Sequence, residues 1–300
     1  MRPHIFLRHQ KLLSRCFSRY FSSISSQNNG TVQLSYNEYG DGSETKGPLV
    51  MVHGLFGNKQ NFTSLAKRLS SDGRKVLTVC CRNHGESGQS SDMDYHLMAK
   101  DLENLLDDLK LKDVILLGHS MGGKLVMTSA LTHPERLKGL VVVDVTPAIS
   151  PSGHLESYAR KMREIPLRKN LSLSRARLEV DSQLQSTVQD KIVRNFLLTN
   201  LVENSNGDVE WRINLDSIIS NFNKILGFPT DIHDVTFDKP SLFIGGTRSP
   251  QISGNTIPKI KEFFPTCDIE LIEGAGHWVH SEKSNQFLQI VKNFLDQKNL

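Results

Sequence analysis

The chain has 300 residues, of which 38% are hydrophobic and 23% are charged, and this balance fits one large soluble α/β domain with or without an inserted subdomain. No stretch approaches the run of about 18 apolar residues that a membrane span needs, so the sequence predicts no transmembrane segment. The net charge of +4 depends on the first 27 residues, because the rest of the chain has 31 basic and 32 acidic residues. This near-zero net charge argues against a nucleic-acid partner.

Residues 1–27 have a composition of their own, with five basic residues, no acidic residue and many serines. Such a composition is typical of an organellar import peptide, and Arg19 lies three residues before a cleavage site that we predict after Phe21. A mitochondrial protein, in the matrix, is therefore expected; a chloroplast transit peptide and a merely disordered basic tail are the alternatives. The four cysteines do not form a disulfide framework, which fits a reducing compartment.

From residue 31 the chain alternates predicted strands and helices. Alternating polar and apolar residues predict a half-exposed strand at 32–39, and apolar runs predict strands at 49–52, 76–80, 114–118 and 137–143. Apolar residues repeating every three or four positions predict helices at 61–69, 95–109 and 123–133. The run at 49–52 is continuously apolar, as expected for a strand buried on both faces of a parallel sheet.

The alternation stops after residue 143. Residues 150–230 contain no short apolar strand runs and are predicted to be helical. The alternation resumes with strands at 241–245 and 269–272 and with helices at 257–264 and 284–295. This interruption predicts a helical lid, residues 150–230, inserted into a mostly parallel sheet whose core is formed by residues 31–149 and 231–300.

The sequence G-H-S-M-G at 118–122 joins a predicted strand directly to a predicted helix. In that context the motif predicts a nucleophile elbow, which exposes the hydroxyl of Ser120 at the top of the sheet. The amide of Met121 then points to where an oxyanion would form, and a second donor is expected from the H-G-L-F-G loop at 53–57. We expect this donor to be the amide of Leu55, with Phe56 as the alternative.

A serine nucleophile needs a base and an acid that orients the base. His277 follows the last predicted strand in a loop of small residues and is the predicted base. Asp144, at the end of the strand next to the elbow, is the predicted acid, and Asp216 is the alternative. Ser249 is expected to add a hydrogen bond to the pair of Asp144 and His277.

Residues 160–177 of the predicted lid contain seven basic residues and one acid. Solvated helix faces explain this stretch, and attraction to an anionic lipid surface, which would make the protein a peripheral membrane protein, is the alternative. No spacing of cysteine or histidine indicates a metal site.

Several separated motifs resemble those of the α/β-hydrolase domain-containing protein 11 family and of bacterial short-acyl esterases. They are the stretches at 53–57, 118–124, 144–147, 211–215 and 276–280. The resemblance implies an α/β-hydrolase fold with a mostly parallel eight-stranded sheet flanked by helices. It also implies a mitochondrial serine ester hydrolase that acts on acyl esters or acylglycerols and needs no cofactor. A thioesterase or amidase with the same triad, and a ligand-binding or scaffold protein that retains the fold, are the alternatives, and the sequence leaves the oligomeric state open.

Overall fold

The computed structural model of the protein describes residues 30–40, 46–71, 73–151 and 153–300. Its main feature is a seven-stranded sheet with the strand order β1-β3-β2-β4-β5-β8-β9, in which β1 is antiparallel to β3 and every other pair is parallel. The strands are β1 (Tyr36–Tyr39), β2 (Lys46–Val52), β3 (Arg74–Val79), β4 (Val114–His119), β5 (Leu137–Val143), β8 (Ser241–Gly246) and β9 (Asp268–Ile272).

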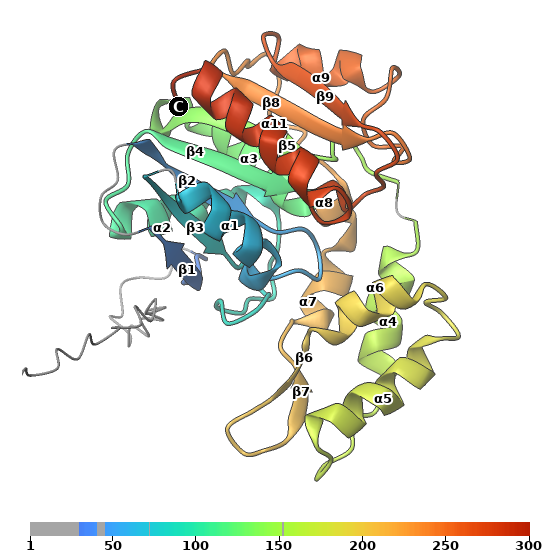
Figure 1. The fold of residues 1–300 in the computed structure, drawn as a ribbon. Coiled ribbons are helices and arrows are strands. Elements are labelled where there is room, and N and C mark those ends of the chain that lie inside the picture. Colours follow the sequence, from blue (N-terminus) through green and yellow to red (C-terminus); the bar gives the residue numbers. More distant parts are fainter. Residues whose placement is uncertain (1–29, 41–45, 72, 152) are drawn as a thin grey trace, which may run out of the picture.

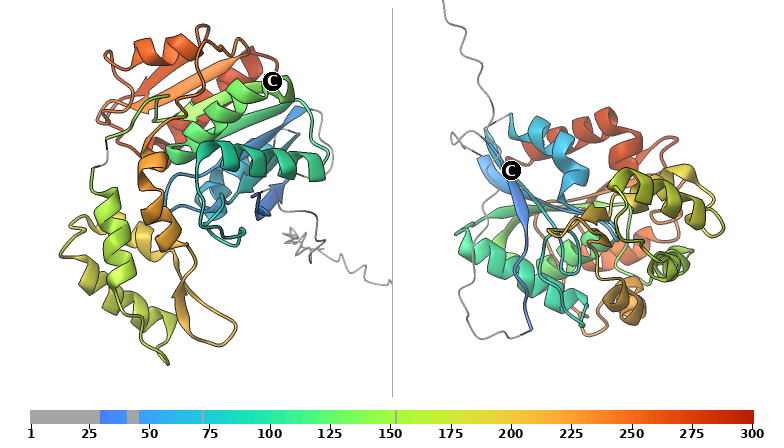
Figure 2. Two further views of the ribbon diagram at one scale, coloured as in Figure 1. Left: turned by 180° about the vertical axis from the view of Figure 1, so that it is seen from behind. Right: turned by 90° about the horizontal axis from the view of Figure 1, so that it is seen from below.

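Helices cover both faces of this sheet (Figure 1 and Figure 2). One face carries α1 (Thr63–Ser70) and α11 (Ser284–Gln297), and the other carries α2 (Tyr95–Asp108) and α3 (Met121–Thr132). Two shorter helices, α9 (Ile257–Phe263) and α10 (Val279–Glu282), flank the last strand along the chain. The predicted α/β architecture is thereby confirmed.

The period of two along each strand divides the core between the two faces. In β2, Leu49 and Met51 pack with α1 and α11, whereas Val50 and Val52 pack with α2 and α3. All four side chains are buried, which explains why the sequence of this strand is apolar without interruption.

The sheet has seven strands within the described residues, where the family resemblance implied eight. The predicted strand at 32–39 is shorter than expected because its first half bonds elsewhere. The carbonyl oxygens of Gln33 and Ser35 accept hydrogen bonds from Gly88 and Cys80, and the amide of Val32 donates to the Asp101 carboxylate at 2.8 Å. Because these backbone groups are bonded in this way, the segment before Tyr36 is a loop and not part of β1.

Among the described residues, five helices lie between β5 and β8, and the first four lie beside the sheet rather than on it (Figure 1). They are α4 (Leu155–Glu164), α5 (Leu173–Leu184), α6 (Lys191–Leu198), α7 (Leu215–Ser220) and α8 (Phe222–Leu226). The prediction of helices alone was incomplete, because β6 (Leu201–Glu203) and β7 (Val209–Trp211) form an antiparallel hairpin here. The turn of this hairpin contains Gly207 at φ +80°, a conformation that glycine adopts without strain, and its strands are too short to give a periodic signal.

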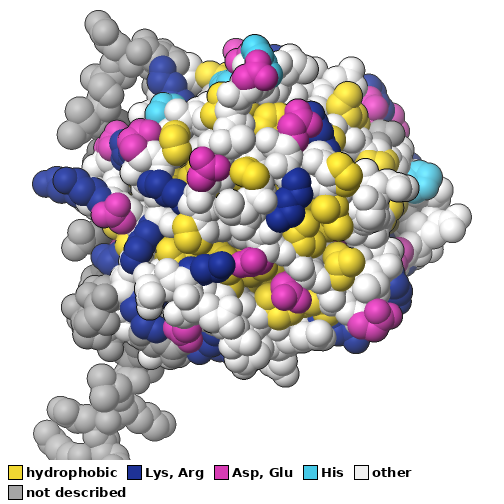
Figure 3. Space-filling view, turned by 90° about the horizontal axis from the view of Figure 1, so that it is seen from above, with side chains coloured by type: hydrophobic (Ala, Val, Ile, Leu, Met, Phe, Trp, Pro, Cys, Tyr) yellow, Lys and Arg dark blue, Asp and Glu magenta, His cyan; other side chains and the backbone are white. Residues whose placement is uncertain are grey.

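Charged side chains of both signs lie close together on the face that Figure 3 shows. On the side that is uppermost in Figure 1, basic and acidic side chains alternate with hydrophobic ones (Figure 3). In the inserted segment, Arg160, Arg163 and Arg168 form ion pairs with Glu156, Asp216 and Glu179. No helix within the described ranges is both long and apolar enough to cross a bilayer. The predicted import peptide lies outside the described residues.

Candidate active site

The elbow between β4 and α3 holds Ser120 in a conformation that side chains rarely adopt. Its backbone lies at φ +53° and ψ −117°, and its amide donates to the carbonyl oxygen of Val143 on β5 at 3.0 Å. A Cβ atom on Gly118 would lie 2.1 Å from the carbonyl oxygen of Gly122. Glycine at position 118 is therefore required for the strand to turn directly into the helix.

The loop after β2 packs against this elbow. A Cβ atom on Gly54 would lie 2.9 Å from Nδ1 of His119 and 3.2 Å from Cβ of Ser120. The carbonyl oxygen of Gly54 accepts hydrogen bonds from the Gly57 amide at 2.9 Å and from Nδ1 of His53 at 2.8 Å. Because a trans peptide is planar, fixing this carbonyl also fixes the Leu55 amide, which points the opposite way.

Two amides are thus available for an oxyanion, those of Leu55 and Met121. Within the described residues, neither of them donates to a protein acceptor. The alternative donor, the amide of Phe56, is already bonded to Nε2 of His84 at 3.3 Å. The geometry favours Leu55 over Phe56, and α3 begins at Met121, so that its positive end faces the same point.

His277 and Asp144 form a hydrogen-bonded pair. Nδ1 of His277 donates to Oδ2 of Asp144 at 2.7 Å, and the carboxylate of Asp144 is fully buried. Asp144 also accepts a hydrogen bond from Oγ of Ser249 at 2.5 Å and one from the amide of Gly246 at 3.3 Å. With its proton held on Nδ1, the imidazole presents Nε2 as a proton acceptor.

The alternative acid, Asp216, lies on α7 of the inserted segment. Its side chain is 81% exposed and pairs with Arg163 at 3.3 Å. No hydrogen bond connects it to His277 within the described part of the chain. The structure therefore brings Asp144, and not Asp216, to the imidazole.

Two further histidines surround His277, and the sequence did not single them out. Nε2 of His119 donates to the carbonyl oxygen of His277 at 2.9 Å, and the rings of His119 and His280 lie 4.6 Å apart. Burial lowers the pKa of His280 to about 3 and also holds the pKa of His119 well below its usual value. Both rings are therefore neutral at pH 7, so they place no positive charge beside the imidazole of His277.

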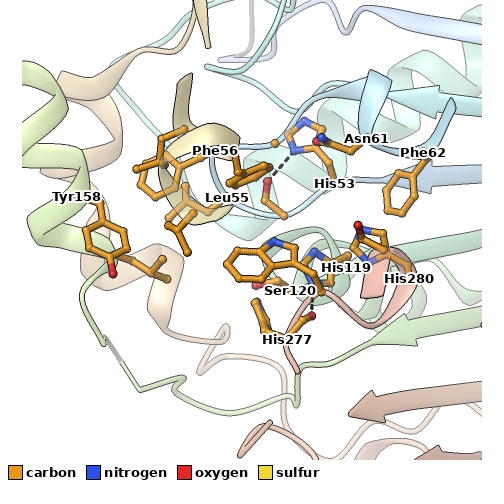
Figure 4. A pocket seen from close by; sticks show the side chains of 18 of the residues that line it. His53, Leu55, Phe56, Asn61, Phe62, His119, Ser120, Tyr158, His277 and His280 are labelled. Carbon is orange, nitrogen blue, oxygen red and sulfur yellow. Dashed lines mark hydrogen bonds between the residues drawn. The ribbon is translucent and has the colours of Figure 1, made fainter. Parts of the chain in front are cut away.

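Ser120 and His277 line one cavity of about 310 Å³. Figure 4 shows them together with His119 on one side of this cavity, while Tyr158 of α4 lies across it. The core contributes apolar side chains to the wall, and the inserted segment adds Leu155, Tyr158, Val193, Phe196 and Leu197. Such a cavity can hold an apolar acyl group next to the serine.

Among the described residues, no group of three or more His, Cys, Asp or Glu side chains is arranged to hold a metal ion.

Comparisons with known proteins agree with this geometry. The family described as the alpha/beta hydrolase fold matches residues 47–284. The sn-1-specific diacylglycerol lipase ABHD11 of Danio rerio is 44% identical over 88% of this chain and 83% of its own length. Esterase YbfF of Escherichia coli is 32% identical over 83% of this chain and 93% of its own length. The solved structure of a marine microorganism esterase is similar with a TM-score of 0.81 and 34% identity, and covers 88% of this chain and all of its own.

Proposed function

This chain belongs to the α/β-hydrolase fold family and is a carboxylic ester hydrolase, and from this premise we propose that Ser120 is its nucleophile, His277 its general base and Asp144 the acid that orients the base. The observation that carries the proposal is the hydrogen bond of 2.7 Å from Nδ1 of His277 to the buried Asp144 carboxylate, in a cavity that Ser120 also lines. Ser249 supports the acid through its own hydrogen bond of 2.5 Å.

The reaction follows from this arrangement. Oγ of Ser120 attacks the ester carbonyl carbon while Nε2 of His277 takes the hydroxyl proton. The amides of Leu55 and Met121 stabilise the negative oxygen of the tetrahedral intermediate. The carbon–oxygen bond to the alcohol then breaks, and His277 protonates the departing oxygen. A water molecule, deprotonated by His277, releases the acid from Ser120 in the same way.

Acyl esters of glycerol are the substrate class that we propose. The relative from Danio rerio is named a diacylglycerol lipase, and the cavity presents apolar side chains of α4 and α6 to an acyl group. The inserted segment would act as the predicted lid over this group, because it supplies those side chains.

Replacing the nucleophile tests the assignment. We expect Ser120→Ala to lower kcat/KM for p-nitrophenyl butyrate and monobutyrylglycerol by at least about 1,000-fold while its circular dichroism and thermal unfolding stay those of the wild type. Activity of Ser120→Ala near the wild-type level would refute the mechanism. A butyryl thioester and a butyryl amide in the same assay separate an esterase from a thioesterase or amidase.

We further propose that residues 1–27 direct the protein to mitochondria and that cleavage after Phe21 removes residues 1–21. The support is the basic, acid-free composition of this segment. The N-terminal sequence of the mature protein, isolated from cells that express the full chain, tests this; a protein that keeps residues 1–21 would contradict it.

A further inference from the structure

The oxyanion loop, residues 54–57, is held by hydrogen bonds on each of its peptide groups. The first group is fixed at the Gly54 carbonyl, as described above. The second is fixed at the Phe56 amide, which donates to Nε2 of His84 at 3.3 Å. The third is fixed at the carbonyl oxygen of Phe56, which accepts a hydrogen bond from Nδ2 of Asn200 at 2.8 Å.

Asn200 differs from the other partners because it comes from the inserted segment. It lies between α6 and β6, and it is fully buried. Its own backbone is fixed as well, since its amide donates to Leu197 and its carbonyl oxygen accepts from Arg212, both at 3.0 Å. Leu197 lines the catalytic cavity, so one rigid turn of the insertion contacts both the cavity and the oxyanion loop.

The chemistry of Asn200 indicates that its donor has a positional role. Nδ2 makes two hydrogen bonds, to Phe56 and to Leu197, while the buried Oδ1 has no partner within the described residues. A buried acceptor without a partner lowers stability, so Oδ1 does not explain the asparagine. An apolar side chain here would leave the buried Phe56 carbonyl oxygen without its donor, so the function of Asn200 lies in Nδ2, which holds that carbonyl.

The segment that Asn200 holds is strained. Phe56 lies at φ +63°, which is unfavourable for a residue with a side chain, so the loop needs contacts that keep it in place. His84 can serve as an acceptor because burial lowers its pKa to about 4 and keeps the ring neutral. Without Asn200, the Phe56 amide would keep its hydrogen bond to His84, but the Phe56 carbonyl oxygen would lose the one from Nδ2.

We propose that Asn200 is a positioning residue for the oxyanion loop, so that the inserted segment, by docking on the core, holds the Leu55 amide where it meets the developing oxyanion. This inference rests on the proposed function, because it takes Leu55 as an oxyanion donor. Correct placement of the insertion would thereby be coupled to transition-state stabilisation as well as to substrate binding.

The test compares two buried asparagines of the same insertion. Asn221 is a matched control, because its Nδ2 donates to a core carbonyl, that of Ser91, at 2.7 Å and to its own helix turn at 2.9 Å, but it does not contact the oxyanion loop. Asn200→Leu and Asn221→Leu are assayed with p-nitrophenyl butyrate, with the concentration of active enzyme set by titration with a fluorophosphonate. Asn200→Ala, which removes the donor without adding a charge, serves as a second variant.

We expect Asn200→Leu and Asn200→Ala to lower kcat by roughly 10- to 100-fold with KM changed by less than about threefold, because a misplaced donor acts on the transition state. Inhibition by a trifluoromethyl ketone, which forms a tetrahedral adduct, should weaken in the same proportion. Asn221→Leu should keep kcat within about twofold of the wild type. Equal kcat for the two leucine variants, or a change confined to KM, would overturn the proposal; active Ser120→Ala would instead overturn the proposed function.

Discussion

Asp144 illustrates how a single residue is adapted to one task. It stands directly after β5 at φ +51°, and its buried carboxylate accepts from His277, Ser249 and Gly246. A buried carboxylate is costly unless it is paired and hydrogen-bonded, and these three donors supply that compensation. As an acceptor, Asp144 selects the tautomer of His277 that leaves Nε2 free.

The two candidate acids can be separated by matched amide substitutions. We expect Asp144→Asn to lower kcat/KM by about 10,000-fold, because the new amide can donate to Nδ1 and so favour the wrong tautomer. Asp216→Asn should stay within about twofold, since it removes only an exposed ion pair with Arg163. Steady-state kinetics with p-nitrophenyl butyrate measures both. A larger loss for Asp216→Asn than for Asp144→Asn would reverse the assignment.

At the scale of elements, the site depends on how closely α3 approaches β2. The backbone of Gly122 in the first turn of α3 lies against the end of β2, where a Cβ atom would be 2.4 Å from the carbonyl oxygen of Val52 and 2.5 Å from that of His53. These neighbours are backbone atoms, which cannot rotate away as a side chain can. The close contact brings the Met121 amide to the oxyanion loop that follows β2.

Adding one methyl group tests this contact. We expect Gly122→Ala to lower the free energy of unfolding by about 1–3 kcal/mol, because the helix must move away from β2, and to lower kcat as the two oxyanion donors separate. Gly254→Ala is the control, since no atom lies within 4 Å of its added Cβ, and its effect should be within about 0.5 kcal/mol. Urea unfolding measures both; equal stabilities of the two variants would show that the contact is not tight.

Across the whole molecule, neutral histidines are buried where the sheet, the oxyanion loop and the C-terminal segment meet. Burial lowers the pKa of His53 and of His280 to about 3 and that of His84 to about 4. In the unfolded chain these groups have a pKa of about 6.5, so below that pH the unfolded state binds more protons than the folded state. Their contribution to stability is therefore present above pH 6.5 and is lost as the pH falls toward 3.

His280→Phe provides the measurement for this effect. Its neighbours include the rings of Phe62 and Phe287, and its buried Nδ1 has no partner within the described residues, so a phenyl ring should fit without breaking a bond of that atom. Between pH 6.5 and 4 the free energy of unfolding of this variant should fall less steeply than that of the wild type, by about 1.4 kcal/mol per pH unit for one group. Chemical unfolding at several pH values measures the slopes, and parallel slopes would contradict the assignment.

Much of this architecture could be predicted from local patterns. The alternating pattern at 32–39 and the apolar runs located the seven strands of the sheet, and the elbow motif identified where Ser120 lies between β4 and α3. Short strands were harder to predict. The strands β6 and β7 of the hairpin are too short for the alternation of polar and apolar residues to be visible in the sequence. The residues around the oxyanion loop gave no local signal, because His84 and Asn200 lie 28 and 144 residues from Phe56 along the chain.

The sequence by itself determined the alternation of strands and helices and, within it, the positions of the proposed nucleophile and the proposed base, because backbone sterics and apolar periodicity act over a few neighbouring residues. Only the tertiary structure decided between Asp144 and Asp216 as the partner of His277, favoured the Leu55 amide over that of Phe56, and brought Asn200 to the oxyanion loop. Each of these depends on a hydrogen bond a few ångströms long between residues far apart in the chain. Such contacts are set by how the layers pack, which no local pattern of residues encodes.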